Sequence, residues 1–138
     1  MKIYLQDNGM WKLYILERDS EELSKRKVRI ADDKFIADGI YISDNVLIGK
    51  DVFIGDMVFI GKGAIIRDGA TIEKRVHIGN GAYIGEYAYI RENAVISENI
   101  IVPARASIAW GAYICNIHHP AVALCSPAYK PLETGAYK

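Results

Sequence analysis

The sequence predicts an all-β solenoid in which one short strand and one sharp corner recur every six residues. The first observation is that every sixth position from Ile30 to Ile114 holds Ile or Val. The second is an apolar column two positions earlier, from Val28 to Ala112, interrupted only by Lys34. Residues two apart on a strand point to the same side, so each six-residue unit contributes two inward side chains. An amphipathic helix is excluded, because its apolar residues recur about every 3.6 positions.

The corners between the predicted strands are rich in residues that tolerate a positive φ. They are Gly39, Asn45, Gly63, Gly69, Gly81, Asn93, Asn99 and Gly111. The same face returns inward after every corner, which a row of hairpins does not allow. We therefore expect a coil with flat sides, in which each strand stacks in parallel on its equivalent one coil away.

Units such as residues 48–53 (IGKDVF) and 78–83 (IGNGAY) resemble the hexapeptide-repeat family, the left-handed parallel β-helix of many acyltransferases. The resemblance implies three repeats per coil and a left-handed winding, an exception to the right-handed crossover rule. It therefore predicts about five coils, which at a strand spacing of about 4.8 Å form a prism about 24 Å tall.

Two flanks frame the repeats, and we expect one structural domain with three parts: a hairpin or cap at 1–27, the β-helix at 28–116 and an irregular tail at 117–138. Apolar alternation around Asn8-Gly9 predicts a type I′ hairpin, which would cover the open end of the first coil. The charged residues 17–27 predict a short helical turn capped by Asp19 or Ser20. Pro120 is the first of three prolines that favour an irregular tail.

The residue before each core Ile is expected to point outward. At a spacing of eighteen, these positions form three stripes: Tyr41, Phe59, His77, Val95 and Tyr113; Leu47, Ile65, Tyr83 and Ile101; and Phe35, Phe53, Thr71, Tyr89 and Ser107. Soluble monomers avoid such apolar stripes. Either the hairpin and tail cover them, or they are subunit contacts. The family resemblance favours a homotrimer, with sites in the clefts between neighbouring prisms.

His77 is the one histidine within the repeats, and it lies on an outward stripe at mid-height. It could be an interface histidine hydrogen-bonded to a neighbour. It could also be a general base, because a pKa near 6.5 lets an imidazole accept a proton at neutral pH.

His118-His119-Pro120 follows the last core Ile and resembles the His-Pro element of sugar O-acetyltransferases with this fold. The resemblance implies that His119 is a catalytic base, and His118 takes the place of a variable residue and is a further candidate. A hydrogen-bonding role in the tail is the alternative. A γ-carbonic-anhydrase-like zinc site is a minor alternative, but it would need an H-x4-H pair that adjacent His118 and His119 do not supply. We expect no metal.

Charge and composition exclude several classes of partner. Lys plus Arg equals Asp plus Glu, and the longest apolar runs are only a few residues, so we expect neither nucleic acid nor membrane as a partner. Residues 1–7 lack the core of a signal peptide. Cys115 and Cys125 are expected as reduced thiols, with a disulfide at the tail as the alternative. The expected location is cytoplasmic.

Two functions remain open, and so does the question whether the protein is an enzyme. The first is acyl transfer from acetyl-CoA, as co-substrate, to a hydroxyl or amine of a small acceptor such as a sugar. The second is a non-catalytic, trimeric structural or binding module. The sequence assigns no residue to coenzyme A.

Overall fold

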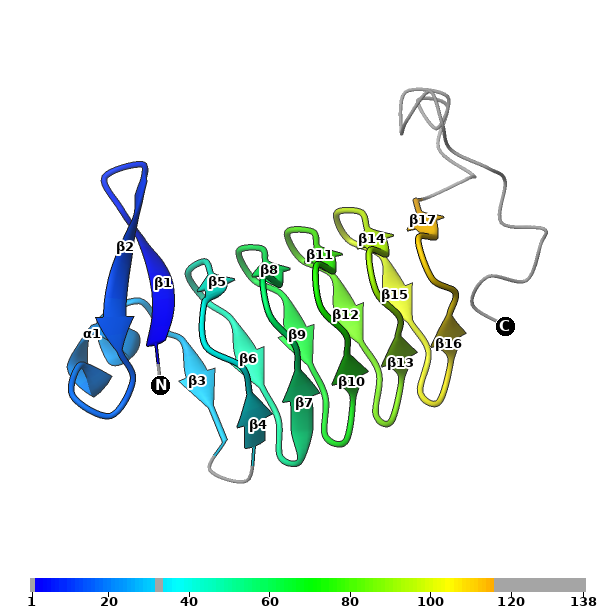
Figure 1. Ribbon diagram of the computed structural model, residues 1–138, viewed down its shortest axis with the longest axis horizontal. Coiled ribbons are helices and arrows are strands. Elements are labelled where there is room, and N and C mark those ends of the chain that lie inside the picture. The colour runs from blue at the N-terminus through cyan, green and yellow to red at the C-terminus, as the bar shows by residue number, and fades with distance from the viewer. Residues whose placement is uncertain (1, 32–33, 116–138) are drawn as a thin grey trace.

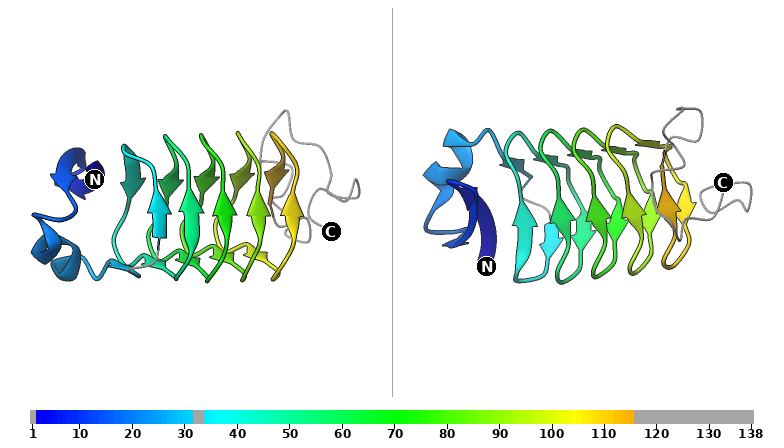
Figure 2. Two further views of the ribbon diagram at one scale, coloured as in Figure 1. Left: turned by 60° about the horizontal axis from the view of Figure 1, so that its bottom comes forward. Right: turned by 90° about the horizontal axis from the view of Figure 1, so that it is seen from above.

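The computed structural model describes residues 2–31 and 34–115 and shows a three-sided prism of stacked coils (Figures 1 and 2). Sheet A has the strand order β17-β14-β11-β8-β5-β1-β2, sheet B β15-β12-β9-β6-β3, and sheet C β16-β13-β10-β7-β4. From β6 onward each strand pairs with the third strand before it and so joins the same sheet. The expected three repeats per coil and about five coils are therefore confirmed. The left-handed winding and the division into cap, β-helix and tail stay predictions.

The strands of the coils are two or three residues long, and each ends on the Ile or Val of the six-residue column. They are β3 (Arg29–Ile30), β4 (Lys34–Ile36), β5 (Ile40–Ile42), β6 (Leu47–Ile48), β7 (Val52–Ile54), β8 (Phe59–Ile60), β9 (Ile65–Ile66), β10 (Thr71–Ile72), β11 (His77–Ile78), β12 (Tyr83–Ile84), β13 (Tyr89–Ile90), β14 (Val95–Ile96), β15 (Ile101–Val102), β16 (Ser107–Ile108) and β17 (Tyr113–Ile114). They pair in parallel in a register of eighteen, as Ile72 does with Ile90.

The core consists of these stacked columns. From Ile54 to Ile108 every residue of the Ile/Val column is at most 1% exposed. The column is looser at its start, where Ile30 is partly buried and packs against the core. Identical side chains one above another fill the interior without polar groups, since no described polar or charged residue is buried there.

Each corner places one residue in the left-handed region. All eight glycines and asparagines expected to have positive φ do so. The same position also holds six residues that prefer other conformations: Lys27, Asp51, Met57, Arg75, Tyr87 and Arg105, with φ between 56° and 65°. The coil geometry therefore imposes this conformation at every described corner, whatever the residue type.

Glycines directly after a core Ile let successive coils approach closely. At Gly85 a Cβ would lie 2.4 Å from the nitrogen of Ala104 and 2.7 Å from the carbonyl carbon of Pro103. Real Cβ atoms do not come that close to backbone. Glycine at this position is therefore a requirement of coil stacking.

The N-terminal hairpin extends sheet A beyond the first coil (Figure 1). Strands β1 (Lys2–Asp7) and β2 (Met10–Ile15) are antiparallel, and Asn8 and Gly9 both have positive φ, which confirms the type I′ turn. Strand β1 pairs in parallel with β5, so the hairpin covers one edge of the first coil. The two-residue turn pairs Ile3 with Tyr14, and both side chains are buried, whereas Trp11 lies on the opposite face.

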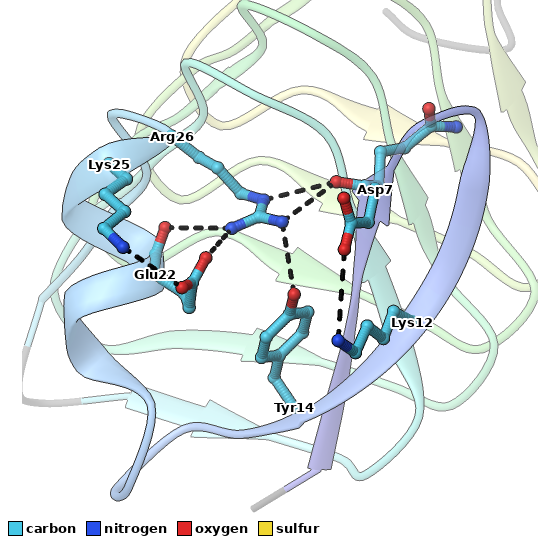
Figure 3. A network of polar contacts seen from close by, with 7 residues as sticks. Asp7, Lys12, Tyr14, Glu22, Lys25 and Arg26 are labelled. Carbon is cyan, nitrogen blue, oxygen red and sulfur yellow. Dashed lines mark hydrogen bonds and ion pairs between the residues drawn. The ribbon is translucent and has the colours of Figure 1, made fainter.

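A polar network joins the hairpin to helix α1 (Ser20–Lys25), which is the expected helical turn (Figure 3). The guanidinium of Arg26 donates to the carbonyl oxygen of Gln6 at 3.1 and 3.3 Å and to the hydroxyl of Tyr14 at 3.3 Å, and it forms an ion pair with Glu22. Asp19 is the N-cap residue, but its carboxylate does not cap the helix: it accepts the N–H of Ile15 and pairs with Arg18.

Candidate functional site

The outward side chains of sheet A lie in one row, here called the ring column: Tyr4, Tyr41, Phe59, His77, Val95 and Tyr113. The rings of Tyr4 and Tyr41 and those of Tyr41 and Phe59 are nearly parallel, with centroids 4.5 Å apart in both pairs. Trp11 of the hairpin meets Tyr41 and Phe59 edge-on at 5.2 and 5.7 Å. The hairpin therefore covers the start of this stripe.

His77 ends the stacked part of the ring column and is exposed. Its ring is 5.8 Å from that of Phe59 and tilted by 28°. No group among residues 2–31 and 34–115 hydrogen-bonds to the imidazole. Its two nitrogens are therefore available to a substrate or to a second subunit, and no acceptor within the described chain selects its tautomer.

A hollow of about 240 Å³ opens directly beside His77. Its lining consists of His77, Gly79, Asn80, Val95, Ile96, Ser97, Glu98 and Tyr113. Val95, on β14, lies between His77 on β11 and Tyr113 on β17. A short aliphatic side chain therefore stands at a position where the other residues of the ring column have rings. The hollow is therefore the place where the ring column is interrupted.

The corner residues of this hollow supply polar groups. The Asn80 Oδ1 accepts the backbone N–H of Lys62 at 2.9 Å, which leaves the Asn80 amide nitrogen to donate elsewhere. Within the described chain the Glu98 carboxylate forms no ion pair and the Ser97 hydroxyl no hydrogen bond. The backbone N–H of Gly79 donates to the Ile96 carbonyl at 2.7 Å, so this N–H is not free to donate to a ligand in the hollow.

A second hollow of about 380 Å³ lies on sheet B in the first coils and is basic. Arg29, Lys50 and Arg67 line it together with Leu47 and Asp68. The Asp68 Oδ1 accepts the N–H of Lys50 at 2.9 Å, and Arg67 reaches Glu86 at 3.7 Å. Two of the three cations thus have no ion-pair partner among the described residues, and this surface could attract an anion.

Of the predicted site residues, the structure places only His77. His118 and His119 lie outside the described residues, and so does Cys125. Cys115 is buried and disulfide-bonded, so the expectation of a reduced thiol is wrong at this position. Among the described residues no group of three or more metal-ligating side chains comes together, and no helix is long and apolar enough to cross a bilayer. The cytoplasmic location stays a prediction.

Val95, Ser97 and Glu98 were not predicted as site residues. One signal in the sequence could have indicated them: at a spacing of eighteen, Val95 is the only member of its stripe without a ring. The polar residues of the hollow have no such signal, because in the sequence Ser97 and Glu98 are indistinguishable from ordinary solvated corner residues.

Comparison with known proteins agrees with this architecture. Residues 51–86 match the family model "Bacterial transferase hexapeptide (six repeats)". Residues 51–86 therefore carry the repeats of that model, and the described chain is a parallel β-solenoid. A search of curated proteins finds no match.

Among solved structures, the chain is similar to a mutant of GDP-perosamine N-acetyl transferase from Caulobacter crescentus in complex with CoA and GDP-perosamine. The identity is 15% and the TM-score 0.32, over 72% of this chain and 57% of that one. A likeness at this level says nothing about activity or substrate.

Proposed function

We propose that this protein transfers an acetyl group from acetyl-CoA to a hydroxyl or amine of a small acceptor such as a sugar, with His77 as general base. One observation carries the proposal. The segment that matches the transferase hexapeptide model, residues 51–86, contains the exposed His77 beside a hollow. In the proposed trimer this surface of sheet A borders a cleft, where a second subunit would supply the acceptor that holds the imidazole.

In the proposed reaction His77 removes the proton from the acceptor hydroxyl or amine as that group attacks the thioester carbonyl. The tetrahedral oxyanion then collapses and expels the thiolate of coenzyme A, which takes up a proton from the protonated base. His119 is a second candidate for the same role, from its His-Pro context, and His118 a third.

The test is thiol release from acetyl-CoA with a panel of amino-sugar and hydroxyl acceptors. Replacing the base should lower the rate by about 10²–10⁴-fold. We expect this loss for His77→Ala, with little change for His118→Ala, His119→Ala and the control Thr71→Ala, whose side chain lies on sheet C. If only His119→Ala lowered the rate of thiol release, His119 rather than His77 would be the base.

A non-catalytic binding module is the second candidate. It is favoured by the free imidazole of His77 and by the absence of any inserted loop between the described strands β4 and β17. If the wild-type protein neither turns over acetyl-CoA nor gains thermal stability from coenzyme A, the transferase proposal is wrong. A ligand at 100 times its Kd would add about 2.7 kcal/mol.

A further inference from the structure

The larger hollow, of about 380 Å³, lies where the chain leaves strands β3, β6 and β9 of sheet B, in the first coils of the prism (Figure 1). The residue directly after the core Ile is Ala31 in the first of these coils, Gly49 in the second and Arg67 in the third. Two small residues before a long one leave a recess in the surface of the prism. The side chains of Arg29 and Leu47, which are paired in register, border this recess on the flat side.

The charged groups that line this hollow do not balance. Arg29, Lys50 and Arg67 line it together with a single carboxylate, that of Asp68. The Asp68 Oδ1 accepts the backbone N–H of Lys50 at 2.9 Å, so it satisfies a backbone group and not one of the cations. Arg67 reaches Glu86 at 3.7 Å, but these side chains are 41% and 50% exposed, and such surface pairs are weak. Within the described chain Arg29 and Lys50 have no ion-pair partner.

Another corner of the prism shows that neighbouring coils can neutralise a lysine at this place in the repeat. Lys74 and Glu92 are eighteen residues apart, as Lys50 and Asp68 are, and their ion pair is 3.2 Å long. The side chain of Asp68 is one methylene shorter than that of Glu92, and its Oδ1 is already bonded to a backbone N–H. The ammonium of Lys50 therefore lacks a partner, although a carboxylate stands at the same spacing.

Charge and size together indicate the class of ligand. A phosphate monoester carries nearly two negative charges at neutral pH and has three oxygens that accept hydrogen bonds. Guanidinium groups bind such oxygens with two parallel hydrogen bonds, and a lysine ammonium binds them as a point charge. The hollow falls within the range of about 300–1,000 Å³ typical of small-molecule pockets, so it has room for more than the phosphate group. Leu47, which is 38% exposed, supplies an apolar wall for the rest of the ligand.

We propose that this hollow binds a small organic phosphate monoester. The guanidinium groups of Arg29 and Arg67 and the ammonium of Lys50 hold the phosphate, and the organic part packs against Leu47. The proposal goes beyond acyl transfer and does not depend on it, because the hollow lies on sheet B and His77 lies on sheet A. Either proposal can fail alone, since thiol release tests the transferase and equilibrium binding tests the phosphate site.

The experiment measures binding of phenyl phosphate and of inorganic phosphate to the full chain by isothermal titration calorimetry in a phosphate-free buffer. Wild type should bind both saturably, and phenyl phosphate more tightly, because its ring adds contact with Leu47. Phenol, which lacks the phosphate, should not bind. Lys50→Gln and Arg67→Gln should each weaken binding of phenyl phosphate about tenfold or more, since each variant loses a hydrogen bond between charged groups.

Lys62 provides a matched control on another corner. It follows a glycine, as Lys50 does, and the Asn80 Oδ1 accepts its backbone N–H as Asp68 accepts that of Lys50. Lys62 lines neither hollow. Lys62→Gln therefore removes the same charge from the same backbone setting and should leave binding unchanged. All three variants should melt like wild type, because none of the replaced side chains belongs to a buried residue.

Competition identifies the source of the phosphate. If coenzyme A displaces phenyl phosphate and dephospho-coenzyme A does not, the bound group is the 3′-phosphate of the acyl donor. If neither displaces it, the site takes the phosphate of another small molecule, such as a phosphorylated acceptor.

Three results would overturn the proposal. The first is the absence of saturable binding of either phosphate to wild type. The second is equal weakening by Lys50→Gln and Lys62→Gln, which would indicate general attraction to surface charge. The third is displacement by dephospho-coenzyme A, which has no phosphate monoester. If wild type bound no phosphate and Lys50→Gln changed the oligomeric mass, the hollow would instead receive an acidic side chain of a second copy of this chain.

Discussion

At the scale of single residues, the backbone conformation at a corner of this solenoid depends on the residue's place in the six-residue repeat and not on its type. Met57 has a φ of 58° only because it occupies the corner that every sixth residue occupies. A side chain with a Cβ costs about 1–2 kcal/mol in that conformation. Eight described corners have glycine or asparagine, which lower this cost, and Met57 does not have that advantage.

Replacing Met57 by glycine should therefore stabilise the protein. Relief of the left-handed strain outweighs the larger entropy of glycine in the unfolded chain, about 0.5–1 kcal/mol, so the net gain is up to about 1 kcal/mol. Met57 is 51% exposed, so little packing is lost. Urea denaturation measures the change. Met57→Ala is the control, because it keeps the Cβ, and finding the alanine variant more stable than the glycine variant would contradict the prediction.

At the scale of elements, the N-terminal cap depends on polar contacts that need charged carboxylates. The hydrogen bond from Arg26 is the main cause that holds the pKa of Glu22 below its ordinary value. The pKa of Asp19 is also lowered, first by its hydrogen bond with Arg18 and then by the N–H of Ile15. Glu22 pairs with Arg26, whose guanidinium reaches the hairpin at Gln6 (Figure 3). Asp19 accepts the N–H of Ile15 at the end of the hairpin.

A carboxyl whose pKa is lowered by folding stabilises the folded state above its unfolded pKa, near 4.3 for glutamate, and loses that contribution as the pH falls through the lowered value. Acid should therefore loosen the cap before the coils. Amide hydrogen exchange of β1 and α1 should accelerate, relative to that of β8–β13, on passing from pH 6 to pH 3. The acceleration should be smaller in Glu22→Gln and unchanged in Glu21→Gln. Equal acid responses in the wild type and Glu22→Gln would refute the role of Glu22.

At the scale of the whole molecule, the flat sides of the described coils carry exposed apolar side chains on more than one face. On sheet C, Phe35 and Phe53 stack at 5.1 Å and are 66% and 40% exposed. On sheet B, Ile101 is 69% exposed. Trp11 covers only the start of the stripe on sheet A. Such stripes favour the proposed homotrimer.

Light scattering should return about three times the 15.4 kDa chain mass at micromolar concentration. Phe53→Glu places a charge on a flat side and should shift the protein toward the monomer, because a buried unpaired charge is costly. Met10→Glu, at the exposed tip of the hairpin, should leave the mass unchanged. A monomeric wild type would refute both the trimer and any site shared between subunits.

Much of this fold could be predicted from the sequence, because the repeat that generates it is only six residues long. Each six-residue unit contains its own inward pair and its own corner, so Ile66 and Gly69 indicate their roles without knowledge of any distant residue. The turn at Asn8-Gly9 is equally local. The number of repeats per coil came from the resemblance, because six residues look the same whether three or four units complete a coil.

The tertiary structure alone decided the features that join units far apart in the chain. The hollow at Val95 is lined by side chains of successive coils, and on sheet C the Tyr89 hydroxyl donates to Glu73, which lies sixteen residues earlier in the chain. The position of Trp11 over Tyr41 and Phe59 depends on how the hairpin adds to sheet A. The sequence by itself determined the solenoid, because short-range periodicity specifies its backbone. It did not determine the candidate site, because that site is a space defined by the packing of side chains eighteen residues apart.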